Sequence, residues 1–147
     1  MAESKLSPIS LQLERVFAHA PEKVFDAWTQ AGALARWFAP TDDYTSIVHT
    51  LELTPGGRYR IEMKPKSGPS HTVYGRYVEV LRPERLVFTW AWEDGFQPGE
   101  TLVTVEFKRQ GAGTQMTLIH ERFIDDDQRE KHNQGWLGCL GRLERQV

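Results

Sequence analysis

Hydrophobic and polar residues alternate along most of the chain, which is typical of strands that bury one face. In the first such segment the apolar side of the alternation carries Ile9, Leu11, Leu13 and Phe17. Arg15 falls on the same side, so its guanidinium is expected to face inward. Further segments with strand character follow between residues 41 and 122, separated by turns rich in glycine and proline. Strands joined by short turns predict an antiparallel sheet.

Within these segments the alternation predicts which side chains face the interior. In the second segment one side of the alternation carries Ile47, His49, Leu51 and Leu53, so we expect these four to share a face. His120, in the last segment, shares a predicted face with Met116 and Leu118. The other inward positions are rich in large side chains: Tyr59, Met63, Tyr77, Phe88 and Trp90.

Two short helices are predicted directly after the first strand. Pro21 suits a first helical turn because its missing N–H has no partner there, and Glu22 follows where the helix dipole favours a negative charge. Leu34, Trp37 and Phe38 then indicate a second short helix that ends before Pro40.

A longer helix is predicted at the C-terminal end. Its apolar stripe recurs at helical spacing through Trp136, Leu140, Leu143 and Val147. Asp125, Asp126 and Asp127 offer N-cap oxygens where the helix begins, and Asp127 with Glu130 has the spacing of a capping box. Three glycines, Gly135, Gly138 and Gly141, interrupt it. They are read as places of close approach, as a thin wall beside a cavity, or as tolerated surface positions.

These elements predict an α+β fold. We expect a seven-stranded curved antiparallel sheet wrapped around the long C-terminal helix, with two short helices after strand 1. Residues 1–8 are expected to form a flexible N-terminus and residues 9–147 a single domain.

Composition excludes several classes of function. The 147 residues carry a net charge of −2, which argues against a broad nucleic-acid surface and against attraction to membranes. No apolar run is long enough to cross a membrane and no signal peptide is visible, so a cytoplasmic location is expected. The single cysteine, Cys139, cannot form an internal disulfide.

Five ordered motifs resemble the family of homologues of the activator of heat-shock protein 90 ATPase. They lie at residues 15–29, 34–40, 75–90, 117–121 and 135–143, and the resemblance covers roughly residues 9–147. The family is part of the START or birch-pollen-allergen helix-grip superfamily, which also holds polyketide cyclases, aromatases and lipid carriers. The resemblance implies a cavity between the sheet and the long helix that holds a hydrophobic or amphipathic small molecule.

We therefore expect a small-molecule-binding protein rather than an enzyme, and no cofactor. One alternative is an enzyme of the polyketide cyclase or aromatase kind. Another is a co-chaperone-like interaction module, because the family is named after a co-chaperone whose C-terminal domain has this fold. A homodimer also stays open as an assembly.

The candidate ligand-binding residues are mostly large and apolar. The apolar ones either pack in the core or line the cavity. With two polar residues, the candidates are Arg15, Trp37, Phe38, Tyr59, Met63, Tyr77, Phe88, Trp90, His120 and Trp136. Arg15 is expected to pair with Glu79, Glu121, a carbonyl or a bound acid, because an unpaired buried charge is costly. His120 is read as a hydrogen-bonded core residue or as a polar contact to a ligand.

Metal chemistry is not expected. No two of the five histidines have the close spacing of a zinc motif, and a cysteine set is lacking. Folding of the sheet is the one route by which His49, His71 and His120 would meet.

Overall fold

The computed structural model describes residues 9–95 and 98–147, so the flexible N-terminus expected over residues 1–8 lies outside the described residues. One antiparallel sheet has the strand order β1-β7-β6-β5-β4-β3-β2. Its strands are β1 (Ser10–Phe17), β2 (Tyr44–Leu51), β3 (Arg58–Pro65), β4 (His71–Leu81), β5 (Arg85–Trp92), β6 (Thr101–Gln110) and β7 (Gly113–Glu121). The helices are α1 (Pro21–Thr29), α2 (Ala31–Trp37) and α3 (Asp126–Gln146).

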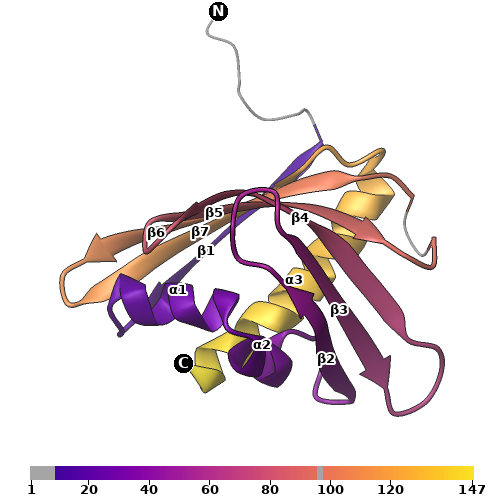
Figure 1. Ribbon diagram of the computed structural model, residues 1–147, viewed down its shortest axis with the longest axis horizontal. Helices are drawn as coiled ribbons and strands as arrows, with labels where there is room; N and C mark the ends of the chain where they lie inside the picture. Colours follow the sequence, from indigo (N-terminus) through magenta and orange to yellow (C-terminus); the bar gives the residue numbers. More distant parts are fainter. Residues whose placement is uncertain (1–8, 96–97) are drawn as a thin grey trace, which may run out of the picture.

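The sheet curves around α3, and α1 and α2 lie on the same side of the sheet near the C-terminal end of α3 (Figure 1). This arrangement confirms the predicted helix-grip fold with its seven strands, long terminal helix and two short helices. The first strand, β1, lies at the edge of the sheet and pairs with β7, so the first and last strands of the chain are neighbours.

The stripe on α3 packs against the sheet as its spacing predicts. Trp136, Leu140 and Leu143 are buried, and Val147 packs at the edge of the same core. The helix begins after the first of the three predicted N-cap aspartates, and the capping pair differs from the predicted Asp127 and Glu130. Asp125 is the N-cap, and its carboxylate accepts a hydrogen bond from the backbone N–H of Gln128 at 2.9 Å. Asp125 and Gln128 have the same spacing as Asp127 and Glu130, so the capping pair lies two residues earlier than predicted.

The predicted face of β2 is wrong for its first half. Tyr44, Ser46 and Val48 point toward the core, whereas Ile47 and His49 lie outward and exposed. The register of β2 on β3 shifts between Val48 and Thr50. Such a bulge inserts a residue and reverses the alternation, so Leu51 and Leu53 still pack on the core.

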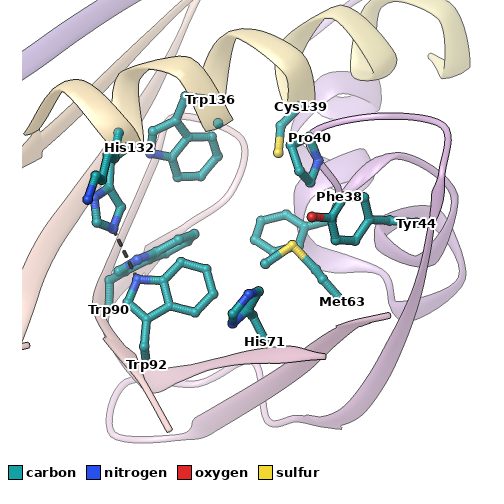
Figure 2. Close-up of a pocket in the computed structure, with 12 residues that line it drawn as sticks. Phe38, Pro40, Tyr44, Met63, His71, Trp90, Trp92, His132, Trp136 and Cys139 are labelled. Atoms are coloured by element: carbon teal, nitrogen blue, oxygen red, sulfur yellow. Dashed lines mark hydrogen bonds between the residues drawn. The ribbon is translucent and has the colours of Figure 1, made fainter. Parts of the chain in front are cut away.

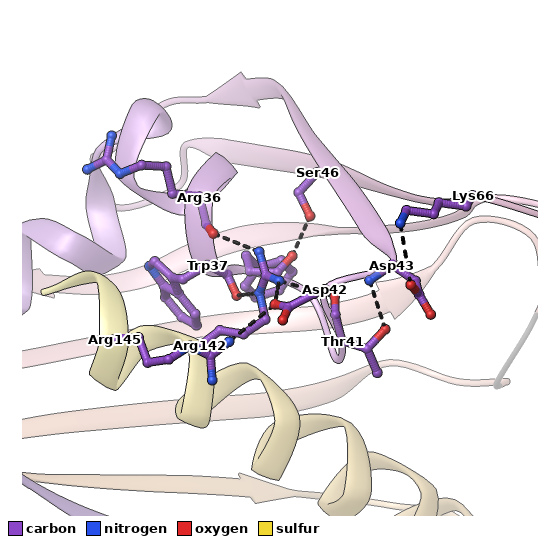
Figure 3. Close-up of polar contacts among 10 residues, drawn as sticks. Arg36, Trp37, Thr41, Asp42, Asp43, Ser46, Lys66, Arg142 and Arg145 are labelled. Atoms are coloured by element: carbon purple, nitrogen blue, oxygen red, sulfur yellow. Dashed lines mark hydrogen bonds and ion pairs between the residues drawn. The ribbon is translucent and has the colours of Figure 1, made fainter.

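The segment after α2 is held tightly against α3. A Cβ on Gly138 would lie 2.0 Å from the carbonyl oxygen of Pro40, so only glycine permits this approach. Arg142, one turn further along α3, donates hydrogen bonds to the carbonyl oxygens of Arg36 at 2.8 Å and Thr41 at 3.2 Å (Figure 3). Gly138 and Arg142 together fix the loop between α2 and β2 on the helix.

Candidate ligand-binding cavity

A cavity of about 420 Å³ lies between α3 and the strands β2 to β5 (Figure 2). Its wall is assembled from six elements or connections, and α3 contributes residues spaced three and four apart along one face. The lining residues are Phe38, Pro40, Tyr44, Met63, His71, Trp90, Trp92, Lys131, His132, Gly135, Trp136 and Cys139. The volume lies in the range of roughly 300–1,000 Å³ that is usual for small-molecule sites.

Aromatic rings form the deep part of this cavity. The ring centroids of Trp90 and Trp136 are 5.1 Å apart, and Phe38 lies 5.9 Å from Trp90 and 6.1 Å from Trp136. Met63 adds a thioether, which adapts to ligands of different shape. Within the described residues the buried indole nitrogen of Trp90 has no hydrogen-bond partner, so packing alone holds this ring. The surface offered to a ligand is flat, apolar and rich in π-faces.

His132 is a polar residue of the wall whose two ring nitrogens are both engaged. Its Nδ1 lies 2.8 Å from the carbonyl oxygen of Gln128, and its Nε2 accepts a hydrogen bond from the indole N–H of Trp92 at 3.0 Å. Because a carbonyl only accepts, the proton of the neutral ring sits on Nδ1. Burial lowers the pKa of His132, which keeps the ring neutral.

His120 lies behind the wall, fully buried, and is not among the residues that line the cavity. The indole N–H of Trp136 donates to its Nδ1 at 3.0 Å, so the ring proton sits on Nε2 and is donated to Thr101 Oγ1 at 2.7 Å. The Thr101 hydroxyl in turn donates to the carbonyl oxygen of Trp90 at 3.2 Å. Burial and the nearby His132 hold the pKa of His120 well below its usual range. His120 is thus a neutral ring that links the side chain of Trp136, through Thr101, to the backbone of Trp90.

The other candidates from the sequence divide between cavity and core. Those brought together in the cavity are Phe38, Met63, Trp90 and Trp136. Tyr59, Tyr77 and Phe88 instead surround a void of about 20 Å³ deeper in the core, too small for an organic ligand. Trp37 is buried between the short helices and donates its indole N–H to the carbonyl oxygen of Ala27 at 2.8 Å.

Arg15 does lie on the inward side of β1, but at its rim and away from the cavity. Its guanidinium is 3.7 Å from the carboxylate of Glu144 in the last turns of α3, and its side chain is 26% exposed. Arg15 also donates to the backbone carbonyl oxygen of Glu14 at 2.7 Å, so a carbonyl is among its partners as expected, whereas Glu79 is paired with Arg85 at 3.0 Å. Since α3 passes beside β1 at this end, the helix supplies the counter-charge that the strand pattern could not reveal.

Sequence reasoning missed several lining residues, and two of them had a readable signal. His132 stands four residues before Trp136, so it extends the apolar stripe of α3 by one turn. Trp92 continues the alternation of β5. His71 carries no such signal, because β4 mixes polar and apolar residues on both faces.

Two small residues of α3 shape the cavity wall. Gly135 lines it, and a Cβ at this position would meet nothing within 4 Å. Of the interpretations offered for these glycines, a thin wall beside a cavity applies to Gly135, and close approach of the helix to the backbone of Pro40 applies to Gly138. Cys139 also lines the cavity, and burial raises the pKa of its thiol to about 12.

The three histidines weighed for a metal do not meet. His49 lies beside Glu62 on the outer side of β3, His71 beside Asp94, and His120 in the core. Over residues 9–95 and 98–147 no group of three potential metal ligands is present. In the same ranges no helix is long and apolar enough to span a membrane.

The fold and its cavity define a helix-grip protein, and the comparisons identify the family. The family model described as "Activator of Hsp90 ATPase homolog 1-like protein" matches residues 18–147. The chain therefore belongs to the family of proteins that resemble this activator. No curated protein matches the chain.

Solved structures of similar proteins agree with this assignment. A Chromobacterium violaceum protein is 28% identical, with a TM-score of 0.86 over 95% of this chain and 96% of that chain. The AHSA1 protein from Silicibacter pomeroyi is 28% identical, with a TM-score of 0.80 over 92% of this chain and 95% of that chain. An AHSA1-like protein from Aeromonas hydrophila, 24% identical, shares the fold with a TM-score of 0.77 over 95% of this chain and 92% of that chain.

Proposed function

We propose that the protein binds a small, predominantly apolar aromatic molecule in the cavity between α3 and the sheet. The cavity of about 420 Å³, walled by Phe38, Trp90 and Trp136, is the observation that supports this function most directly. Burial of a flat ring there removes apolar surface from water on both partners, which is the main favourable term in binding such ligands.

Three polar residues that the sequence offered to an acid–base enzyme of the cyclase kind, Arg15, Glu79 and His120, do not line the cavity. Arg15 is paired with Glu144, and Glu79 is paired with Arg85. His120 sits in a closed chain of hydrogen bonds behind the wall. A general acid or base must reach the substrate, and these groups are engaged elsewhere.

Two glycines of α3 allow a sharp test of this proposal. Gly135 and Gly141 both have open space around their Cβ positions, but Gly135 lines the cavity and Gly141 does not. Gly135→Leu is expected to fill part of the cavity, and Gly141→Leu serves as the matched control. Both substitutions remove a helical glycine, so each raises helix propensity by a similar amount.

The probe is 8-anilinonaphthalene-1-sulfonate, titrated against the folded protein and followed by its fluorescence. We expect saturable binding to the wild type and to Gly141→Leu, and at least tenfold weaker binding to Gly135→Leu. Equal binding to all three proteins, or no saturable binding to the wild type, would contradict a ligand site in this cavity. Circular dichroism of each variant checks that the fold is kept.

A further inference from the structure

Tyr44 brings a phenol hydroxyl to one end of the cavity. It is the first residue of β2, is half-buried and lines the cavity. Figure 2 shows its hydroxyl oxygen pointing into the cavity, at the end where Pro40 and Cys139 lie. Within residues 9–95 and 98–147 this hydroxyl has no hydrogen-bond partner. Because tyrosine hydroxyls in apolar surroundings usually have a partner, the cavity offers a polar contact that the described part of the chain does not use.

The nitrogen-bearing side chains of the wall are in a different state. Hydrogen bonds or ion pairs within the chain engage most of them: His71 with Asp94, Lys131 with Asp127, His132 with Gln128 and Trp92, and Trp136 with His120. The indole nitrogen of Trp90 has no partner in the described ranges, but it is wholly buried and out of reach of a ligand. The Tyr44 hydroxyl differs because it is both unpartnered and directed into the cavity.

The chemistry of a phenol decides which group it meets. Its hydroxyl donates a strong hydrogen bond and accepts a weak one, because a lone pair of the oxygen is delocalised into the ring. A ligand therefore contacts it best through an acceptor such as a carbonyl oxygen. A carboxylate is disfavoured because Phe38 and Met63 make this part of the wall apolar. The ammonium of Lys131 stands eight positions before Cys139, which is about 12 Å away along α3.

We propose that the hydroxyl of Tyr44 donates a hydrogen bond to an uncharged carbonyl oxygen of the bound molecule. The inference rests on the binding function proposed above and narrows the ligand class to aromatic ketones and related neutral carbonyl compounds. The ring system of such a ligand lies against Trp90 and Trp136, and its carbonyl group is directed toward the start of β2.

Two probes of nearly equal shape test the inference. 2-Acetylnaphthalene carries a carbonyl, and 2-isopropenylnaphthalene has a methylene group in place of the carbonyl oxygen. Each probe is measured by its displacement of 8-anilinonaphthalene-1-sulfonate, after the dye has been titrated against every protein used. Tyr44→Phe removes the hydroxyl alone. A hydrogen bond of ordinary net strength predicts that this variant binds the ketone about three to ten times more weakly, whereas its affinity for the alkene changes by less than about twofold.

Tyr74→Phe is the matched control. Tyr74 is 43% exposed and does not line the cavity, so the loss of its hydroxyl should leave both affinities unchanged. Each probe is compared with itself across the proteins, which cancels its hydration in water. Circular dichroism checks the fold of each variant. If Tyr44→Phe does not fold, Tyr44→Met, which also fills space without a hydroxyl, gives the same comparison.

The outcomes separate this inference from the function on which it rests. If the ketone loses no affinity in Tyr44→Phe, or if both probes lose affinity equally, the role of Tyr44 is overturned while the cavity remains a binding site. If neither probe displaces the dye from the wild type, the ligand class is overturned and the cavity still binds the dye. If the dye itself does not bind the wild type saturably, the binding function fails and this inference fails with it.

Discussion

Trp136 donates its indole N–H to Nδ1 of His120 at 3.0 Å, a bond that joins α3 to β7 behind the cavity. The chain of hydrogen bonds continues through Thr101 on β6 to the carbonyl oxygen of Trp90 on β5. One buried imidazole thus orients a side chain and a strand that both shape the aromatic wall. Trp92 and His132 repeat the arrangement, with an indole N–H donated to an imidazole at 3.0 Å.

Replacing His120 by phenylalanine is expected to destabilise the protein by about 2–4 kcal/mol. The variant leaves the buried N–H of Trp136 without a partner, which costs about 1–3 kcal/mol, and removes one of the two hydrogen bonds of the Thr101 hydroxyl, worth about 1 kcal/mol. Urea denaturation of both proteins at pH 7.5 measures the difference. The comparison variant Thr101→Val removes both bonds of the Thr101 hydroxyl, to His120 and to the carbonyl oxygen of Trp90, and keeps the bond from Trp136 to His120. A loss below about 0.5 kcal/mol in His120→Phe would show that the network adds little.

The same two histidines predict how stability depends on pH. Burial lowers the pKa of both His120 and His132 in the folded protein, so each ring binds a proton more readily when the chain unfolds. Their contribution is fully present above the ordinary value of about 6.5 and is lost as pH falls from there toward each folded pKa. The limiting slope is about 1.4 kcal/mol per pH unit for each histidine.

Urea denaturation at intervals from pH 7.5 to pH 5 tests this dependence. The pKa values of Glu62 and Glu93 are lowered from the ordinary 4.5 by hydrogen bonds to His49 and Arg60. Their contribution to stability is therefore lost only at pH values below the tested range. In His120→Phe the part of the pH dependence of the unfolding free energy that comes from His120 should disappear, and the part that comes from His132 should remain. A flat stability profile between pH 6.5 and 5 in the wild type would contradict the buried neutral state of both rings.

Gly138 is the glycine of α3 that the packing requires. Gly138→Ala places a methyl group where the carbonyl oxygen of Pro40 lies, and we expect it to destabilise the protein by about 1–3 kcal/mol. Gly141→Ala meets nothing within 4 Å and should instead stabilise by up to about 1 kcal/mol through helix propensity. Thermal denaturation of the pair gives the comparison, and shifts of equal sign would refute the close-approach reading of Gly138.

Periodicity revealed much of this fold because most of the elements bury one regular face. The stripe through Trp136, Leu140 and Leu143 is enough to predict a helix that packs on the sheet, and the structure confirms it. The face of β2 was missed because a bulge between Val48 and Thr50 reverses the alternation. A single inserted residue leaves no mark in a pattern of apolar and polar positions.

The cavity was harder to predict than the fold because its wall has no local motif. Tyr44, His71 and Cys139 come from β2, β4 and α3, and only the curvature of the sheet brings them together. Aromatic residues that alternate on inward faces also divide between cavity and solid core. Trp90 lines the cavity, whereas Tyr77 packs beside it, although both lie on inward faces of neighbouring strands.

Arg142 is the residue by which α3 fastens the loop between α2 and β2, and its removal should affect both stability and binding. Its guanidinium donates to the carbonyl oxygens of Arg36 at 2.8 Å, Trp37 at 3.3 Å and Thr41 at 3.2 Å, and it pairs with Asp42 (Figure 3). The carbonyls of Arg36 and Trp37 end α2 and that of Thr41 lies in the loop that follows, and the same segment carries Phe38, Pro40 and Tyr44 into the cavity wall.

Arg142→Lys keeps the charge but not the planar fork that reaches several carbonyls at once. We expect a loss of about 1–3 kcal/mol, since hydrogen bonds from a charged donor to several carbonyls are lost, and several-fold weaker binding of the cavity probe. Arg145→Lys is the control, because Arg145 is 60% exposed and donates to Oδ1 of Asp42 at 3.2 Å, the same carboxylate that Arg142 contacts. Denaturation and probe titration of both variants decide the matter. If the two behave alike, the carbonyl contacts of Arg142 do not hold the loop.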